Sequence, residues 1–231
     1  GTGTSGIINP LEVRLGADDF DDKDSKDVNN DLSKHFQTFR TFIKYYLQDL
    51  SAYELTKIEE ILIEVYRDKG INFDTDLSKL SSDDYPIMQD LYDKTREKLT
   101  EAKINKEARN VVESLEKICS MLKRATIGAD ARLFNGTSSI KVDNNSDFIV
   151  LDINSLVDSD DTILKTQFFN IINQQFSYYI SSKYLSNGSI PFHDIYPPGH
   201  LNTLVEKLSP NTDFISSSFF LKSSLKASIS K

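Results

Sequence analysis

The sequence predicts a mainly α-helical protein with a small β element, and three observations support this fold class. Between residues 32 and 122, apolar residues recur at steps of three and four, which is the spacing of one face of an α-helix. A capping sequence precedes one of these stretches and a glycine follows it. The pattern changes at Gly128, after which a short continuous apolar run is followed by one more helical stripe.

The composition is that of an ordinary soluble globular protein. The 231 residues are 39% hydrophobic and 27% charged, enough for one large domain or two small ones. The net charge of −8 disfavours a general nucleic-acid binder, which needs a basic surface. Cys119 is the only cysteine, so we expect neither a disulfide framework nor a cysteine zinc site. No apolar run approaches the roughly 18 residues of a transmembrane helix. We therefore expect a reducing, cytoplasmic setting.

The first predicted helical pair spans residues 32–66. Ser51 and Glu54 have the spacing of a capping box, in which the serine hydroxyl and the glutamate carboxylate each accept a backbone N–H. Two helices should meet there as an αα-hairpin, and Gly70 should stop the second one. Such an aromatic-rich stripe is more typical of a packing core than of a cofactor site.

A second pair of helices should follow. Pro86 suits the first turn of a helix over residues 85–99, and another stripe runs from Ala108 to Leu122. Cys119 falls in that stripe, which predicts a buried, inert thiol. We expect residues 31–124 to form at least four helices in two αα-hairpins. The expected core residues are Phe39, Ile43, Ile58, Leu62, Val112 and Leu115.

The pattern after Gly128 predicts a turn at residues 131–137, a short strand at 139–142 and a strand at 148–153. The last run is continuously apolar, as in a parallel sheet covered on both faces. A helix should follow from about residue 160 to 180, which gives half of a βαβ unit. Asp152 would then lie near the carboxyl end of the strand, where nucleotides bind in open α/β sheets. A carboxylate that caps the next turn is the favoured interpretation.

Other candidate sites lack the full pattern of their class. Gly1-Thr-Gly-Thr-Ser-Gly6 has the first six positions of a phosphate loop, but Ile7-Ile8 stands where the loop has a lysine and a hydroxyl residue. We therefore expect a flexible leader, in which Gly3 and Gly6 would bind phosphate at most weakly through their backbone N–H groups. Seven aspartates in residues 18–31 lack calcium-loop spacing and predict a solvated loop. His193 and His200 lack zinc spacing. We therefore predict no catalytic residue and no metal ligand, and the cofactor-binding residues are unknown.

Ordered landmarks over about 175 residues carry a family resemblance. They are Ile8-Asn-Pro-Leu11, Tyr66 with Gly70-Ile71, Tyr85-Pro-Ile87, Leu133-Phe-Asn-Gly136-Thr137, the strand from Phe148 and the helix with Gln167-Phe-Phe-Asn170. On these residues, the chain from Ile8 to about Ser182 resembles the type IV secretion and conjugative-transfer ATPases, the TraC- or TraE-like motors.

The resemblance implies an all-helical subdomain at about residues 31–125, inserted in a RecA-like ATPase core, and a βα remnant of that core after it. Motors of this kind use ATP and Mg²⁺, act as homo-oligomers with other subunits of the apparatus at the inner face of the cell membrane, and drive DNA or protein export. The chain lacks both a complete phosphate loop and a strand ending in Asp-Glu, so no catalytic position carries over. Arg124 or Arg132 would at most supply an arginine finger, which stabilises charge in the transition state. The expectation is a truncated portion of the motor, inactive alone and without a cofactor of its own.

Four regions follow: a leader and acidic loop (1–30), an all-helical subdomain (31–127), a strand–helix remnant of the core (128–185) and an irregular tail (186–231). The leading hypothesis is a part of the motor that acts in assembly or regulation. One alternative is a stand-alone helical adaptor, which would expose Phe36, Phe39 and Phe42 to a partner. Another is a divergent NTPase completed by a second chain.

Overall fold

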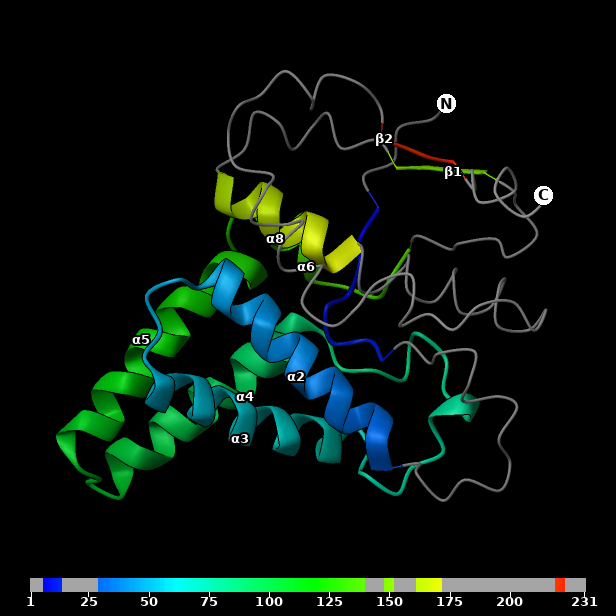
Figure 1. Ribbon diagram of the computed structural model, residues 1–231. Helices are drawn as coiled ribbons and strands as arrows, with labels where there is room; N and C mark the ends of the chain where they lie inside the picture. The colour runs from blue at the N-terminus through cyan, green and yellow to red at the C-terminus, as the bar shows by residue number, and fades with distance from the viewer. Residues whose placement is uncertain (1–5, 14–28, 140–147, 152–160, 172–218, 223–231) are drawn as a thin grey trace. The chain divides into compact units, whose positions relative to one another are not determined.

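The structure is a computed structural model that describes residues 6–13, 29–139, 148–151, 161–171 and 219–222 (Figure 1). The chain divides into two compact units. One comprises Gly1–Leu15 and Asp19–Ile140, and the other comprises Gly16–Asp18 and Lys141–Lys231. Residues 128–139 belong to the first unit, whereas the division predicted from the sequence placed them in one region with residues up to 185. The four-region division itself stays a prediction.

The first αα-hairpin consists of α2 (Asn29–Tyr46) and α3 (Ala52–Asp68). The predicted capping box is present, because Glu54 N–H donates to Ser51 Oγ over 3.3 Å and Ser51 N–H donates to the Glu54 carboxylate over 2.7 Å. Gly70 has a φ of +78°, a conformation that favours glycine, and follows the last turn as predicted. Helix α2 ends at Tyr46 rather than at the capping serine, because the chain turns from Leu47 onward.

The second hairpin consists of α4 (Met88–Ile104) and α5 (Arg109–Thr126), and a short 3₁₀ turn, Leu77–Lys79, precedes it. The four predicted helices and their pairing are confirmed, but two boundaries were wrong. Pro86 lies before the helix, because Ile87 is the N-cap residue and its N–H donates to the Asp90 carboxylate over 2.8 Å. Ala108 is the exposed N-cap of α5 rather than part of its apolar stripe, because the chain reverses at Lys106 with a φ of +54°.

The core of the first unit lies between these helices. Phe39, Ile43, Ile58, Leu62 and Leu115 are buried as predicted, but Val112 is only half-buried, because it lies in the first turn of α5. Phe36, Phe39 and Phe42 are 6%, 2% and 2% exposed, so the aromatic seam is core and offers no surface to a partner. The adaptor alternative loses the feature that motivated it.

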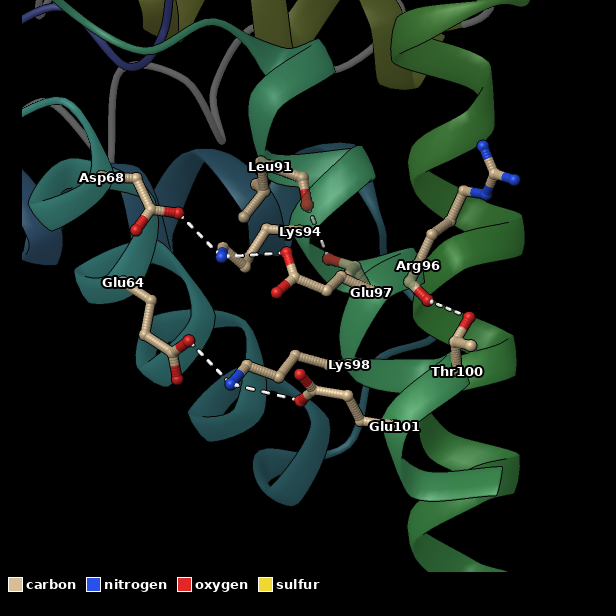
Figure 2. Close-up of polar contacts among 10 residues, drawn as sticks. Glu64, Asp68, Leu91, Lys94, Arg96, Glu97, Lys98, Thr100 and Glu101 are labelled. Carbon is tan, nitrogen blue, oxygen red and sulfur yellow. Dashed lines mark hydrogen bonds and ion pairs between the residues drawn. The ribbon is translucent and has the colours of Figure 1, made fainter. Parts of the chain in front are cut away.

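Ion pairs cross the surface between α3 and α4 (Figure 2). Lys94 Nζ lies 2.7 Å from the Asp68 carboxylate, and Lys98 Nζ lies 2.7 Å from that of Glu64. Hydrogen bonds to Asp68 and Glu97 raise the pKa of Lys94. Pairs of this kind contribute roughly 0.2–1 kcal/mol each when exposed, so they fix the register of the two helices more than they stabilise them.

Replacement of Ile58 by Ala should lower the free energy of unfolding by about 2–4 kcal/mol, since a buried side chain on α3 would leave a cavity. Denaturant unfolding followed by circular dichroism measures the change. Ile104→Ala is the matched control, because Ile104 is 73% exposed and its loss should change stability by less than about 0.5 kcal/mol. Equal losses for the two variants would place Ile58 outside the core.

The chain leaves α5 through a short helix, α6 (Ala131–Phe134), where the sequence predicted a turn. The prediction was wrong because Gly128, Asn135 and Gly136 lie on either side of a four-residue helix that is too short for a recognisable period. Gly128 cannot carry a side chain without movement of the backbone, because a Cβ atom there would lie 2.9 Å from the Arg124 backbone.

The second unit contains β1 (Phe148–Leu151), α8 (Asp161–Ile171) and β2 (Phe219–Lys222). Strands β1 and β2 pair antiparallel, with Phe148 opposite Lys222 and Leu151 opposite Phe219. The one strand that pairs with β1 among the described residues is antiparallel, so a parallel sheet is not shown there. An apolar run alone does not fix the direction of the neighbouring strand. The βα remnant of an ATPase core stays a prediction. Strand β2 lies within the tail predicted to be irregular, and the predicted strand at 139–142 lies almost entirely outside the described residues.

Candidate functional site at the junction of two chain segments

Two segments far apart in the sequence lie side by side in the first unit. We call residues 7–13 the entry segment and residues 133–139 the exit segment. Ser139 N–H donates to the carbonyl oxygen of Ile7 over 3.0 Å, and Ile7 N–H donates to Ser139 Oγ over 2.9 Å. Asn9 N–H donates to Ser138 Oγ over 2.9 Å. The helices between these segments therefore begin and end at one place.

Asn9 is the polar centre of the entry segment and is fully buried. Its side-chain oxygen accepts the N–H of Leu11 over 3.0 Å, and its side-chain nitrogen donates to the carbonyl oxygen of Pro86 over 2.9 Å. The first bond stabilises a tight turn at Pro10, and the second joins that turn to the residues before α4. Both amide atoms are thus used, which is what a buried amide requires.

Tyr66 and His35 hold the entry segment from α3 and α2. The Tyr66 hydroxyl donates to the carbonyl oxygen of Leu11 and lies 2.9 Å from His35 Nε2. Because the hydroxyl has one proton, Nε2 must carry the ring hydrogen and donate to Tyr66. Burial lowers the pKa of His35 to about 3 and raises that of Tyr66, so both groups are neutral at pH 7.

The exit segment is anchored by Phe134 and Asn135. Phe134 is fully buried, with its ring centroid 5.3 Å from that of Phe42 and 5.2 Å from that of Tyr46. The Asn135 side chain accepts the N–H of Gln89 in the first turn of α4 over 2.9 Å and donates to the carbonyl oxygen of Thr126 at the end of α5 over 3.1 Å. One amide therefore joins both helices of the second hairpin to the exit segment.

Gly136 lies where the exit segment passes the side chain of Ile7. A Cβ atom at this position would lie 2.9 Å from Cδ1 of Ile7, closer than side chains ordinarily pack. A side chain at this position would displace the end of the Ile7 side chain, and it would also strain the backbone, because Gly136 has a φ of +158°. The glycine of the Leu133-Phe-Asn-Gly136-Thr137 landmark therefore has a packing role in the junction.

Several landmarks of the family resemblance meet at this junction. Leu11, Tyr66, Pro86 and Gly136 come from four of them, and each contributes a contact described above. The sequence analysis used them, and Asn135 with them, only as ordered markers, and it missed His35 and Ser138 entirely. A polar residue within an apolar run, as Asn9 is between Ile8 and Leu11, was the available signal.

Most of the residues considered for a nucleotide or metal site lie outside the part of the chain that the structure describes. Gly3, Asp152, His193 and His200 lie outside the described residues, and Gly6 is half-buried at the start of the entry segment.

The two arginines considered as arginine fingers have different environments. Arg124 Nη2 lies 3.5 Å from the Asp130 carboxylate, and its guanidinium lies over the Tyr46 ring, whereas Arg132 is exposed. Cys119 is buried, as predicted, and burial raises the pKa of its thiol, which disfavours the reactive thiolate. Among the described residues, no group of three or more His, Cys, Asp or Glu side chains has an arrangement that could hold a metal ion.

The junction therefore connects the two chain segments to the helices. Hydrogen bonds of its polar side chains join α2, α3, α4 and α5 to the entry and exit segments. Such a network favours one relative position of the parts that it joins.

Neither a family model nor a curated protein matches the chain. Among solved structures, the chain is similar to VirB4 of Thermoanaerobacter pseudethanolicus, with a TM-score of 0.60 and 35% sequence identity. The similarity covers 73% of this chain and 39% of that chain, so the present sequence spans well under half the length of the VirB4 chain. The chain is thus related in sequence and structure to a type IV secretion ATPase.

Proposed function

We propose that this chain is a portion of a type IV secretion or conjugation motor ATPase, in which it acts in assembly or regulation. The observation that carries the proposal is the 35% identity to VirB4 over 73% of the chain. The adjacent entry and exit segments support it further, because a subdomain inserted into another domain must leave and return at one place.

In this proposal the first unit, which we call the helical unit, follows movements of the ATPase core. The entry segment would leave the first part of the core and pass directly into the junction, where Asn9 and Tyr66 connect it to α3 and α4. A shift of the entry segment would then reposition the helices as a body, because their contacts with it are buried and specific. The partners would be other copies of the motor and other subunits of the apparatus.

The proposal places the motor at the cytoplasmic face of the cell membrane. In the part of the chain that the structure describes, no helix is both long enough and apolar enough to cross a membrane. A divergent NTPase completed by another chain remains the enzymatic alternative.

The test of the proposed function is co-expression of the tagged chain with the secretion motor of the same host. We expect the chain to co-purify with motor subunits and to lower substrate transfer, because it would compete for contacts that the complete motor makes. An Ile58→Asp chain, which should not fold, is the control for expression alone. Normal transfer together with no recovered motor subunit would refute the proposal.

We expect the purified chain to release no phosphate from ATP above background. Phosphoryl transfer needs a phosphate-loop lysine and magnesium held by a hydroxyl and a carboxylate, and the sequence has no Lys-Ser or Lys-Thr pair behind a glycine loop. The measurement uses millimolar ATP and magnesium, with a phosphate-loop mutant of an intact motor as background. Turnover that survives further purification would favour the divergent NTPase.

A further inference from the structure

We infer that the helical unit carries a binding site for an extended Asn-Pro-Leu peptide, and that the entry segment is a detachable ligand of this site. The inference concerns the helical unit itself and goes beyond the proposed function. It states that the helices stay folded when the entry segment leaves. It also states that the same peptide, supplied separately, can take its place.

The entry segment is bound as a peptide ligand is bound. Ile8 and Leu11 are fully buried and Val13 is 5% exposed, which supplies apolar contact area. Specificity comes from Asn9, whose backbone N–H reaches Ser138 and whose amide nitrogen reaches the Pro86 carbonyl. These partners lie 129 and 77 residues away in the sequence, so no local backbone structure depends on them.

The turn of the docked peptide is held by hydrogen bonds within the peptide itself. Asn9 accepts the N–H of Leu11 through its side chain over 3.0 Å and that of Glu12 through its carbonyl oxygen over 3.2 Å. Pro10 fixes its own φ angle and needs no donor partner. A ligand that already holds its bound turn loses less conformational entropy on binding, which favours binding in trans.

The helices, in turn, have contacts at their ends and between them that do not involve the entry segment. The capping box of α3 is formed by Ser51 and Glu54, and the N-cap N–H of α4 is held by Asp90. The ion pairs of Figure 2 join α3 to α4 directly. Departure of the entry segment would expose Tyr66 and His35 to water, which can replace the hydrogen bond to Leu11.

Native-state hydrogen exchange of the full chain tests the release. We expect the amides of Asn9, Leu11 and Glu12 to exchange at least about tenfold faster than the core amides of α3 and α4, through an opening with little denaturant dependence. Exchange of all these amides at one rate, with the same denaturant dependence, would show that the segment leaves only on global unfolding and would overturn the inference.

Peptide binding tests replacement. A fluorescent peptide with the sequence of residues 6–13 is titrated into full-length Leu11→Ala protein, whose own entry segment is weakened. We expect saturable binding, and binding at least about tenfold weaker for the same peptide with Asn9→Asp, which keeps the turn but loses the donor to Pro86. Loss of helical circular dichroism in the Leu11→Ala protein would overturn the inference, as would equal binding of the two peptides or none.

Discussion

Replacement of Phe134 by Ala is expected to lower the free energy of unfolding by about 3–5 kcal/mol. The ring is fully buried and packs edge-on against Phe42 and Tyr46, so its removal leaves a cavity and ends two aromatic contacts. Denaturant unfolding followed by circular dichroism gives the change in stability.

The matched control for this prediction is Phe73→Ala. Phe73 is 37% exposed and has one described ring contact, with Phe36, so its loss should be clearly smaller. The aromatic cluster at the exit segment would not be a principal part of the core if Phe134→Ala proved no more destabilising than Phe73→Ala.

Acidification is expected to destabilise the folded chain through His35. Burial lowers the folded-state pKa of this histidine to about 3, whereas an unfolded histidine titrates near 6.5. Between these values the unfolded state binds more protons, so the contribution of His35 is fully present above pH 6.5 and is lost as the pH falls toward 3. The expected loss is about 1.4 kcal/mol per pH unit in this window.

The measurement is the free energy of unfolding at several pH values for the original protein and for His35→Gln. The glutamine amide can donate to Tyr66 in place of Nε2 but does not titrate, so the difference between the two curves isolates His35 from the other histidines and the carboxylates. Parallel curves would mean that His35 is not buried in its neutral form in the folded protein.

The helices were predictable because their signals are local. The stripe containing Ile58 and Leu62, the capping box of Ser51 with Glu54, and the stop at Gly70 each depend on residues within one or two turns. Helix boundaries were predicted wrongly where a hydrogen bond from a nearby side chain determines the end of the helix. Ile87, not Pro86, borders α4 because the Asp90 carboxylate holds the Ile87 N–H.

The junction was not predictable from the same kind of signal. Asn9 is held by Pro86 and Ser138, and Tyr66 contacts Leu11 from 55 residues away, so no window along the sequence contains both partners. The family landmarks did mark many of these positions, but as an order along the chain rather than as contacts. The antiparallel partner of β1 was not predictable for the same reason, since β2 begins at Phe219.

The adjacent entry and exit segments also determine how the helical unit bears tension. A pull applied to the chain before residue 7 and after residue 139 first loads the bonds of Ile7 with Ser139 and of Asn9 with Ser138. While these bonds hold, the force passes from one segment to the other and bypasses the helices. Only after they break does tension reach α2 and α5. The junction thus carries forces that are transmitted along the chain and protects the helical fold from them.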